Sequence, residues 1–477
     1  MHVTAHLDVD LLAHEAEDAV TCLLQLQAPM LDADRARPGQ TLVVVLDRSG
    51  SMSGTPLETA KASLRHLVRR LAPQDRFGVV VFDDSAELVV PVRPIADHDL
   101  AVVDHLVAAI HAGGSTDLWG GYQLALRETA GALAATRDDS EVVDAATVVL
   151  VSDGHANAGI TDPAQLKARA QAVLTSDAVT TVTIGLGLGY DEVLLAALAD
   201  GGSGAHRFAA SADELPAALA EEVDGLLDKS VLAATVRVTG RDDHLTGVAT
   251  LQGLPTWVEG STTVIALGDL YAGEERKTLV RLDVASIPAL GLATIADIVL
   301  EYTALPDQLE HTVTLPISVN VVPGDVAAKR VPMPEVVVEQ LLVEAANAKA
   351  TASQSLREGD TAAARDALDK AGATLGSLSQ ALDVMRRHGH LEPTRSQALQ
   401  DALAAETEEL ASLRDQAVEM PAAFSSKLMT MGASAGRRGR GKRAPRDRDR
   451  CPHCAGPLLP IQYGMPASDP GPDVIVG

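Results

Sequence analysis

Short apolar runs alternate with segments of helical period in the first half of the chain. The runs are rich in valine and carry few polar residues, as in TLVVVLD (41–47), RFGVVVFD (76–83) and ATVVLVSD (146–153). Strands of a parallel sheet covered on both faces have this composition, whereas half-solvated strands alternate apolar and polar residues. We therefore expect residues 40–228 to form an α/β domain with a doubly wound, mostly parallel, Rossmann-like sheet. VVVFDDSAELVV (79–90) is the exception, because its short polar turn predicts an antiparallel hairpin.

The apolar pattern changes to a period of two residues in the next part of the chain. In TVTLPISVN (312–320) the apolar residues share one face and the polar residues the other, which is typical of antiparallel strands. This pattern predicts an antiparallel β-sandwich over residues 229–325. The N-terminal segment DAVTCLLQLQAP (18–29) alternates as well. Residues 1–39 are therefore expected to contribute strands to that sandwich, with the α/β domain inserted between them.

The remainder of the chain has three different compositions. Residues 333–420 have a helical period that is interrupted at Gly359, and they predict a helical hairpin or bundle at the C-terminal side. Residues 425–450 are rich in arginine, so they predict a disordered basic linker. Residues 451–477 form a tail with a C-x-x-C motif.

Composition limits the classes of partner. The formal net charge of −26 argues against nucleic acid as the main partner, except through the basic linker, which is more simply a solvated spacer. No segment approaches the roughly 18 consecutive apolar residues of a membrane helix, and the N-terminus lacks the pattern of a leader peptide. Three cysteines fit a reducing compartment. We expect a cytoplasmic protein without a membrane partner.

The segment LVVVLDRSGSMSG (42–54) raises the question of function. Its apolar strand ends in Asp47, and Ser49 and Ser51 follow on the same loop. An aspartate at the carboxyl end of a parallel strand faces the crevice where such sheets bind ligands. Short hydroxyl and carboxylate side chains suit a hard divalent cation such as Mg²⁺. A serine-rich turn that only caps the following helix is the simpler alternative.

Two further loops carry matching donors. Thr116 follows a Gly-Gly turn before a helical segment, and Asp153 follows another buried strand. Because the carboxyl ends of parallel strands share one edge of the sheet, these donors are expected to meet the first three. The predicted set of metal ligands is Asp47, Ser49, Ser51, Thr116 and Asp153.

Residues 40–228 resemble a von Willebrand factor A (VWA) domain with a complete metal-ion-dependent adhesion site, of the bacterial intracellular type. The resemblance implies Mg²⁺ or Mn²⁺ as the cofactor, with Ser49 and Ser51 on the ion and the aspartates acting partly through water. It also implies that a protein partner presents Asp or Glu to the metal. Intracellular members of the family act as adaptors or scaffolds, some beside AAA+ ATPases. We therefore expect a non-enzymatic interaction protein.

Enzymatic alternatives fit the motifs less well. A metal-dependent hydrolase would use the same ion to activate water, and His155 could then serve as a base beside the site. Phosphatases with an aspartyl nucleophile need a second acid two residues later, where this chain has Ser49. A loop histidine exposed to solvent is the simpler reading of His155, since no nucleophile pairs with it.

The C-terminal tail holds a weak zinc motif. Cys451 and Cys454 resemble one knuckle of a zinc ribbon, but a structural site needs about four ligands. No further Cys or His follows, and Cys22 belongs to a distant strand. Zn²⁺ bound within one chain is therefore the weaker interpretation; a site shared between chains is an alternative, and a truncated ribbon is the preferred interpretation.

Overall fold

The computed structural model describes residues 1–31, 38–137, 146–388 and 391–439. All of these residues belong to one unit of the fold, Met1–Lys442. The predicted zinc knuckle, Cys451 and Cys454, lies outside the described residues. No helix among the described residues is both long enough and apolar enough to cross a lipid bilayer.

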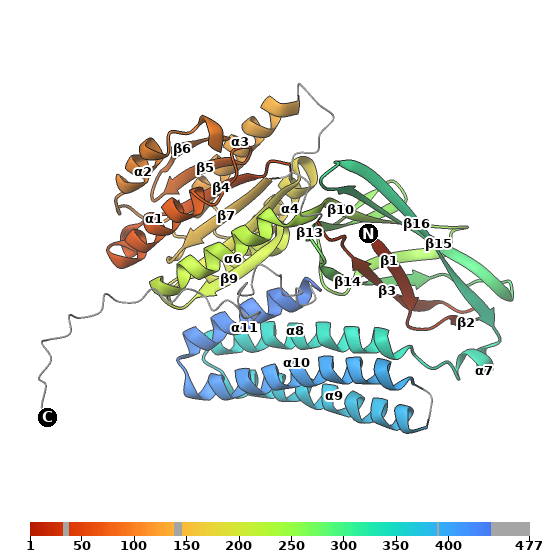
Figure 1. The fold of residues 1–477 in the computed structure, drawn as a ribbon. Coiled ribbons are helices and arrows are strands. Elements are labelled where there is room, and N and C mark those ends of the chain that lie inside the picture. Colours follow the sequence, from red (N-terminus) through yellow and green to blue (C-terminus); the bar gives the residue numbers. More distant parts are fainter. Residues whose placement is uncertain (32–37, 138–145, 389–390, 440–477) are drawn as a thin grey trace, which may run out of the picture. The chain divides into compact units, whose positions relative to one another are not determined.

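A six-stranded α/β sheet is built from the valine-rich runs (Figure 1). Its neighbouring strands are parallel except for β5 and β6, which form the expected antiparallel hairpin. The prediction of a doubly wound, mostly parallel sheet is confirmed. In spatial order the strands are β6 (Ala86–Pro94), β5 (Arg76–Phe82), β4 (Thr41–Asp47), β7 (Ala146–Ser152), β8 (Val179–Leu186) and β9 (Ser203–Ala209).

Two separate apolar cores cover the two faces of this sheet, because alternate residues of each valine run point to opposite faces. On β4, Val44 packs with the helices of one face and Val45 with those of the other. The first face is covered by α1 (Thr55–Val68), α2 (Leu100–Ala108) and α6 (Leu215–Leu227), and the second by α3 (Leu118–Arg137), α4 (Pro163–Asp177) and α5 (Glu192–Gly201). Three short 3₁₀ helices, Gly50–Met52, Ile95–Asp97 and Ala212–Glu214, lie in the connections.

Two further sheets, almost entirely antiparallel, enclose a common apolar core. Among the described strands of these two sheets, only the pairing of β16 with β2 is parallel. One sheet has the order β1 (His2–Leu7), β3 (Asp18–Gln27), β14 (Glu275–Val284), β11 (Leu245–Thr250). The other has the order β12 (Thr256–Glu259), β13 (Thr262–Tyr271), β10 (Lys229–Gly240), β15 (Gly291–Ala304), β16 (Leu309–Val322), β2 (Leu11–Ala13).

The α/β part is inserted in the sequence between two strands of this sandwich. β3 precedes it and pairs with β14, while β10 follows it and pairs with β13 and β15. Val20, Cys22 and Leu24 of β3 face the sandwich core. Leu23 points to the opposite face of the sheet, where it packs against Val336 of a helix. This sheet is therefore covered on both faces, which explains an apolar residue at an otherwise outward position.

The C-terminal part is helical. Gly359, with a φ of 83°, and the N-cap Asp360 separate the first two long helices, as expected for a hairpin. The prediction of a disordered linker from residue 425 is wrong for residues 425–437, because these form most of α11 and bury Ser425, Ser426 and Lys427. The helices are α7 (Gly324–Ala327), α8 (Pro334–Arg357), α9 (Thr361–Arg387), α10 (Pro393–Glu419) and α11 (Ala422–Arg437) (Figure 1).

A buried histidine lies in the sheet where α11 packs on β9. His206 is fully buried, with Nδ1 3.0 Å from the Thr183 hydroxyl and Nε2 3.3 Å from the Tyr190 hydroxyl. Burial lowers the pKa of His206 to about 4, and the opposing charges of Asp200 and Arg438 act more weakly. The neutral imidazole is therefore the form compatible with the fold.

Acidification is expected to destabilise the protein through His206. The unfolded chain binds this proton near pH 6.5 and the folded chain only near pH 4. The contribution of His206 to the free energy of unfolding is therefore fully present above about pH 6.5. It is lost as the pH falls from 6.5 to about 4, by on the order of 3 kcal/mol in total. Urea unfolding of wild type and His206→Gln at pH 7 and pH 4.5 measures the effect. Equal losses in both proteins would contradict it.

Candidate metal centre

The predicted donors lie where the strand order reverses. β4 lies between β5 and β7. After β4 the chain builds β5 and β6 toward one edge of the sheet, and it then returns to build β7, β8 and β9 toward the other edge. Asp47 is the last residue of β4, and Asp153 directly follows β7. Crevices at such switch points, beyond the carboxyl ends of the strands, are the usual ligand sites of open α/β sheets.

Asp47 is held rigidly at the base of the site. Its carboxylate is fully buried, and it accepts hydrogen bonds from the Ser49 amide at 2.8 Å and the Ser152 hydroxyl at 2.5 Å. Burial raises the pKa of Asp47, while these hydrogen bonds oppose the rise. Ser152 was not among the predicted residues, although its place at the end of a buried strand beside Asp153 offered a signal.

The two loop serines connect the aspartates. The Ser51 hydroxyl donates to Asp153 Oδ1 at 2.7 Å, and its oxygen lies 3.1 Å from the Ser49 hydroxyl. Burial, together with the nearby charge of Asp47, raises the pKa of Asp153 to about 6. Two carboxylates that disfavour each other's charge in this way would both be stabilised by a cation between them.

Thr116 is brought in by a loop that depends on glycine. Gly114 has a φ of +68°, and a Cβ there would come within 2.9 Å of the Asp83 side chain. The Thr116 amide donates to Asn157 Oδ1 at 2.9 Å, so the second and third loops support each other. Asn157 was also missed by the sequence analysis, because nothing in its local pattern marks a contact with residue 116.

The donors converge on one point beside Gly154. A Cβ placed on Gly154 would lie 3.3 Å from Ser51 Oγ, 3.4 Å from Thr116 Oγ1 and 3.8 Å from Asp47 Oδ2. The backbone thus leaves a polar space bordered by hydroxyl and carboxylate oxygens. Among the described residues no group of three or more His, Cys, Asp or Glu side chains could hold a metal. A cation here would need the hydroxyls, and an oxygen set of this kind fits Mg²⁺ or Mn²⁺.

The site has a buried base and an exposed rim. Asp47, Ser49 and Thr116 are buried, whereas Ser51 is exposed and Asp153 half-buried. The structure therefore brings all five predicted residues together, with one side of the set open to solvent.

The helix after the first loop, α1, begins without the capping box that its sequence Thr55-Pro56-Leu57-Glu58 suggests. No side chain caps α1, and its N-cap is Gly54 with a φ of 81°. Glu58 pairs with Lys61 at 2.8 Å instead of reaching back to the start of the helix. The start of α1 therefore has no hydrogen bond from a capping side chain at Gly54.

His155 does not form a catalytic pair. Its side chain is 69% exposed, and its only described ion-pair distance is 3.9 Å, to Asp191. No nucleophile is hydrogen-bonded to it among the described residues. This agrees with the simpler reading of an exposed loop histidine.

A family model for the von Willebrand factor type A domain matches residues 41–221. The uncharacterized protein sll0103 of Synechocystis is 31% identical over 174 residues, which cover 36% of this chain and 38% of that protein. The probable E3 ubiquitin-protein ligase WAVH2 of Arabidopsis thaliana is 26% identical over 59% of this chain and 39% of that protein. The chain thus spans less than two fifths of the length of these relatives.

A solved structure extends the likeness beyond the α/β part. A von Willebrand factor type A protein from Catenulispora acidiphila superposes with a TM-score of 0.62 at 18% identity, over 81% of this chain and 87% of that one. Likeness at this identity concerns the fold alone. With the family match and the observed sheet, it leads to one assignment: residues 41–221 of this chain form a von Willebrand factor type A domain.

Proposed function

We propose that this protein binds a divalent cation through Asp47, Ser49, Ser51, Thr116 and Asp153, and recognises an acidic side chain of a protein partner there. The observation that carries the proposal is the convergence of these donors beside Gly154, with the rim at Ser51 open. When bound, the ion would supply an open coordination position for a carboxylate. The chain's own residues orient the donors and keep Asp47 buried.

Electrostatics explain why such a site recognises acidic groups. Three of the five donors are neutral hydroxyls, and in the proposed site the aspartates act partly through water, so the ion keeps part of its positive charge for a carboxylate ligand. Arg48, on the same loop, is already engaged with Asp83 at 3.0 Å and Glu87 at 3.0 Å, so it does not neutralise Asp47. The role that follows is that of an adaptor or scaffold without catalytic activity. A subunit of an AAA+ ATPase assembly is one partner class within this proposal.

Affinity capture with a matched loop variant tests the proposal. Thr116→Ala removes a buried hydroxyl of the donor set, whereas Ser115→Ala removes an exposed hydroxyl one residue away. A partner is expected to be retained by wild type and Ser115→Ala in Mg²⁺, and lost in EDTA or with Thr116→Ala. Peptides that contain glutamate should compete for it, and their glutamine counterparts should not.

Two results would decide against this function. Retention of the same proteins in EDTA and by Thr116→Ala would show that recognition does not pass through the donor set. Turnover of a phosphoester or peptide that disappears in Asp153→Ala would instead establish the metal-dependent hydrolase.

A further inference from the structure

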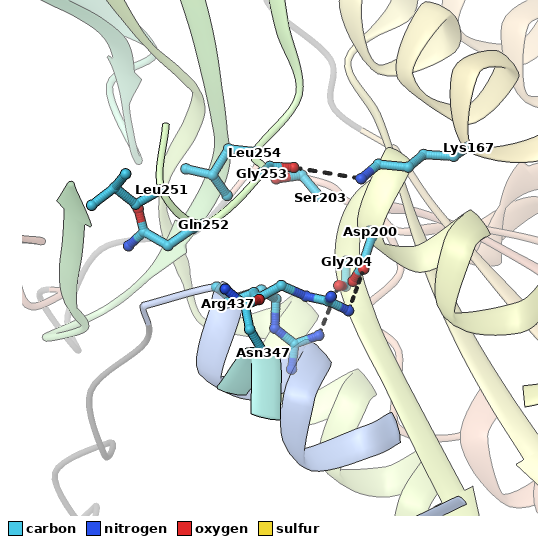
Figure 2. A pocket seen from close by; sticks show the side chains of 11 residues that line it. Lys167, Asp200, Ser203, Gly204, Leu251, Gln252, Gly253, Leu254, Asn347 and Arg437 are labelled. Atoms are coloured by element: carbon cyan, nitrogen blue, oxygen red, sulfur yellow. Dashed lines mark hydrogen bonds and ion pairs between the residues drawn. The ribbon is translucent and has the colours of Figure 1, made fainter. Parts of the chain in front are cut away.

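A cavity of about 180 Å³ lies at the junction of the α/β domain, the sandwich and the helical part, away from the metal centre (Figure 2). The α/β domain contributes Lys167 and Asp200, the loop after β11 contributes Gln252, and the helices contribute Asn347, Arg437 and Arg438. A single water needs roughly 10–15 Å³ of such volume, so this cavity has room for several waters. The cavity is large enough for a phosphate ion or a small phosphomonoester.

The charges that line the cavity are unbalanced. Lys167, Arg437 and Arg438 are cationic, and Asp200 is the one carboxylate among the lining residues. Asp200 already accepts from the Ser434 hydroxyl at 2.7 Å and from Arg437 at 3.0 Å. The Asp200 carboxylate is therefore already paired with residues of α11. The described residues that line the cavity have a net positive charge.

Two side chains that line the cavity, Arg437 and Lys167, have N–H groups that are not fully used in hydrogen bonds to described residues. Arg437 Nε is buried without a hydrogen-bond acceptor among the described residues, although the same guanidinium reaches Asp200. Lys167 forms no ion pair with a described residue, and its ammonium approaches only the Gly253 carbonyl, at 3.5 Å (Figure 2). A buried donor without an acceptor costs free energy that an anion would recover.

We propose that this cavity binds a phosphate group, either free or as a small phosphomonoester. Arginine and lysine together supply the fork-shaped and point-charge donors that phosphate oxygens accept. A phosphate dianion would accept hydrogen bonds from the unused donors of Lys167 and Arg437. Because the ligand would contact all three parts of the fold, its binding would stabilise their junction.

Calorimetric titration of the full chain tests this proposal in EDTA, with Ser51→Ala as background so that the metal centre does not contribute. Inorganic phosphate and glycerol 3-phosphate are the probes, and acetate is the monovalent control. We expect saturable phosphate binding with a rise in melting temperature. Lys167→Met should weaken it roughly tenfold or more, and Lys167→Arg should retain most of it. Lys329→Met, at an exposed site, should leave it unchanged.

Each outcome decides the matter. Tighter binding of glycerol 3-phosphate assigns the cavity to a phosphomonoester, and equal or weaker binding assigns it to free phosphate. Absence of phosphate binding, equal binding of acetate, or an unchanged affinity in Lys167→Met would overturn the proposal. The melting temperature of each variant is also measured without ligand. An unchanged value shows that weaker phosphate binding comes from the lost contact, whereas a lower value shows that the fold itself is damaged. None of these results depends on the proposed metal-dependent recognition.

Discussion

Ser51→Ala is expected to weaken divalent-cation binding strongly while leaving the fold intact. Ser51 is exposed, and its hydroxyl links Ser49 and Asp153. Even the loss of an outer partner of a metal ligand typically lowers affinity by about 10- to 100-fold, and loss of a direct ligand should cost at least as much. Calorimetric titration with Mg²⁺ and Mn²⁺ measures the change.

Ser53 is the matched control for this experiment. It lies two residues further along the same loop and is exposed like Ser51, but no described contact joins its hydroxyl to the donor set. Ser53→Ala should therefore bind metal like the wild type. In thermal unfolding at a metal concentration 100 times the wild-type Kd, wild type and Ser53→Ala should gain about 2.7 kcal/mol, whereas Ser51→Ala, with an affinity 10- to 100-fold lower, should gain only about 1.4 to 0.4 kcal/mol. Similar gains in all three proteins would rule out the donor set as the metal centre.

Lys427→Met is expected to cause a large loss of stability. Lys427 of α11 is buried, and its ammonium donates to Glu192 at 2.7 Å and to the Tyr190 carbonyl at 2.8 Å. It also lies 4.2 Å from the centre of the Tyr190 ring. Removing one partner of a buried ion pair typically costs about 3–5 kcal/mol, and here the buried Glu192 would keep, among the described residues, only the more distant Arg357, at 3.7 Å, as an ionic partner. The midpoint of urea unfolding reports the loss.

A second substitution distinguishes this cause from simple loss of packing. Burial tends to raise the pKa of Glu192, but its contacts with Lys427 and Ser426 hold that pKa below its usual range. Lys427→Met therefore leaves a carboxylate that is costly to keep charged. Adding Glu192→Gln should restore a large part of the stability. Lys370→Met, in an exposed pair with Asp366, should change stability by less than about 1 kcal/mol. A small loss in Lys427→Met, or no recovery in the double variant, would contradict the expectation.

Local sequence predicted the elements whose structure depends on local pattern. Unbroken valine runs such as 41–47 indicated buried parallel strands, and Gly359 marked the helical hairpin. The sequence Asp162-Pro163 is likewise a local signal for a helix start, and the Asp162 side chain accepts from the Gln165 amide at 2.7 Å. Each of these depends on residues close together in the chain.

Elements stabilised by distant partners were not predictable in this way. Ser425, Ser426 and Lys427 of α11 are polar but buried, and Ser426 and Lys427 meet Glu192 on α5. Nothing near residue 427 reveals that partner. At the metal centre the five donors followed from their places after strands, whereas Ser152 and Asn157 act through hydrogen bonds between separate loops. Such contacts become visible only once the strand order is known.

The insertion of the α/β domain also affects the order in which the chain can fold during synthesis. Strand β3 pairs with β14, as in Leu23 opposite Leu279, and the whole α/β domain is encoded between them. At about 5–20 residues per second, the first strands wait on the order of tens of seconds for their partner to leave the ribosome. The inserted domain has its own cores and has time to fold first. Until β14 emerges, β3 remains an apolar strand without this neighbour, the kind of segment that chaperones protect from aggregation.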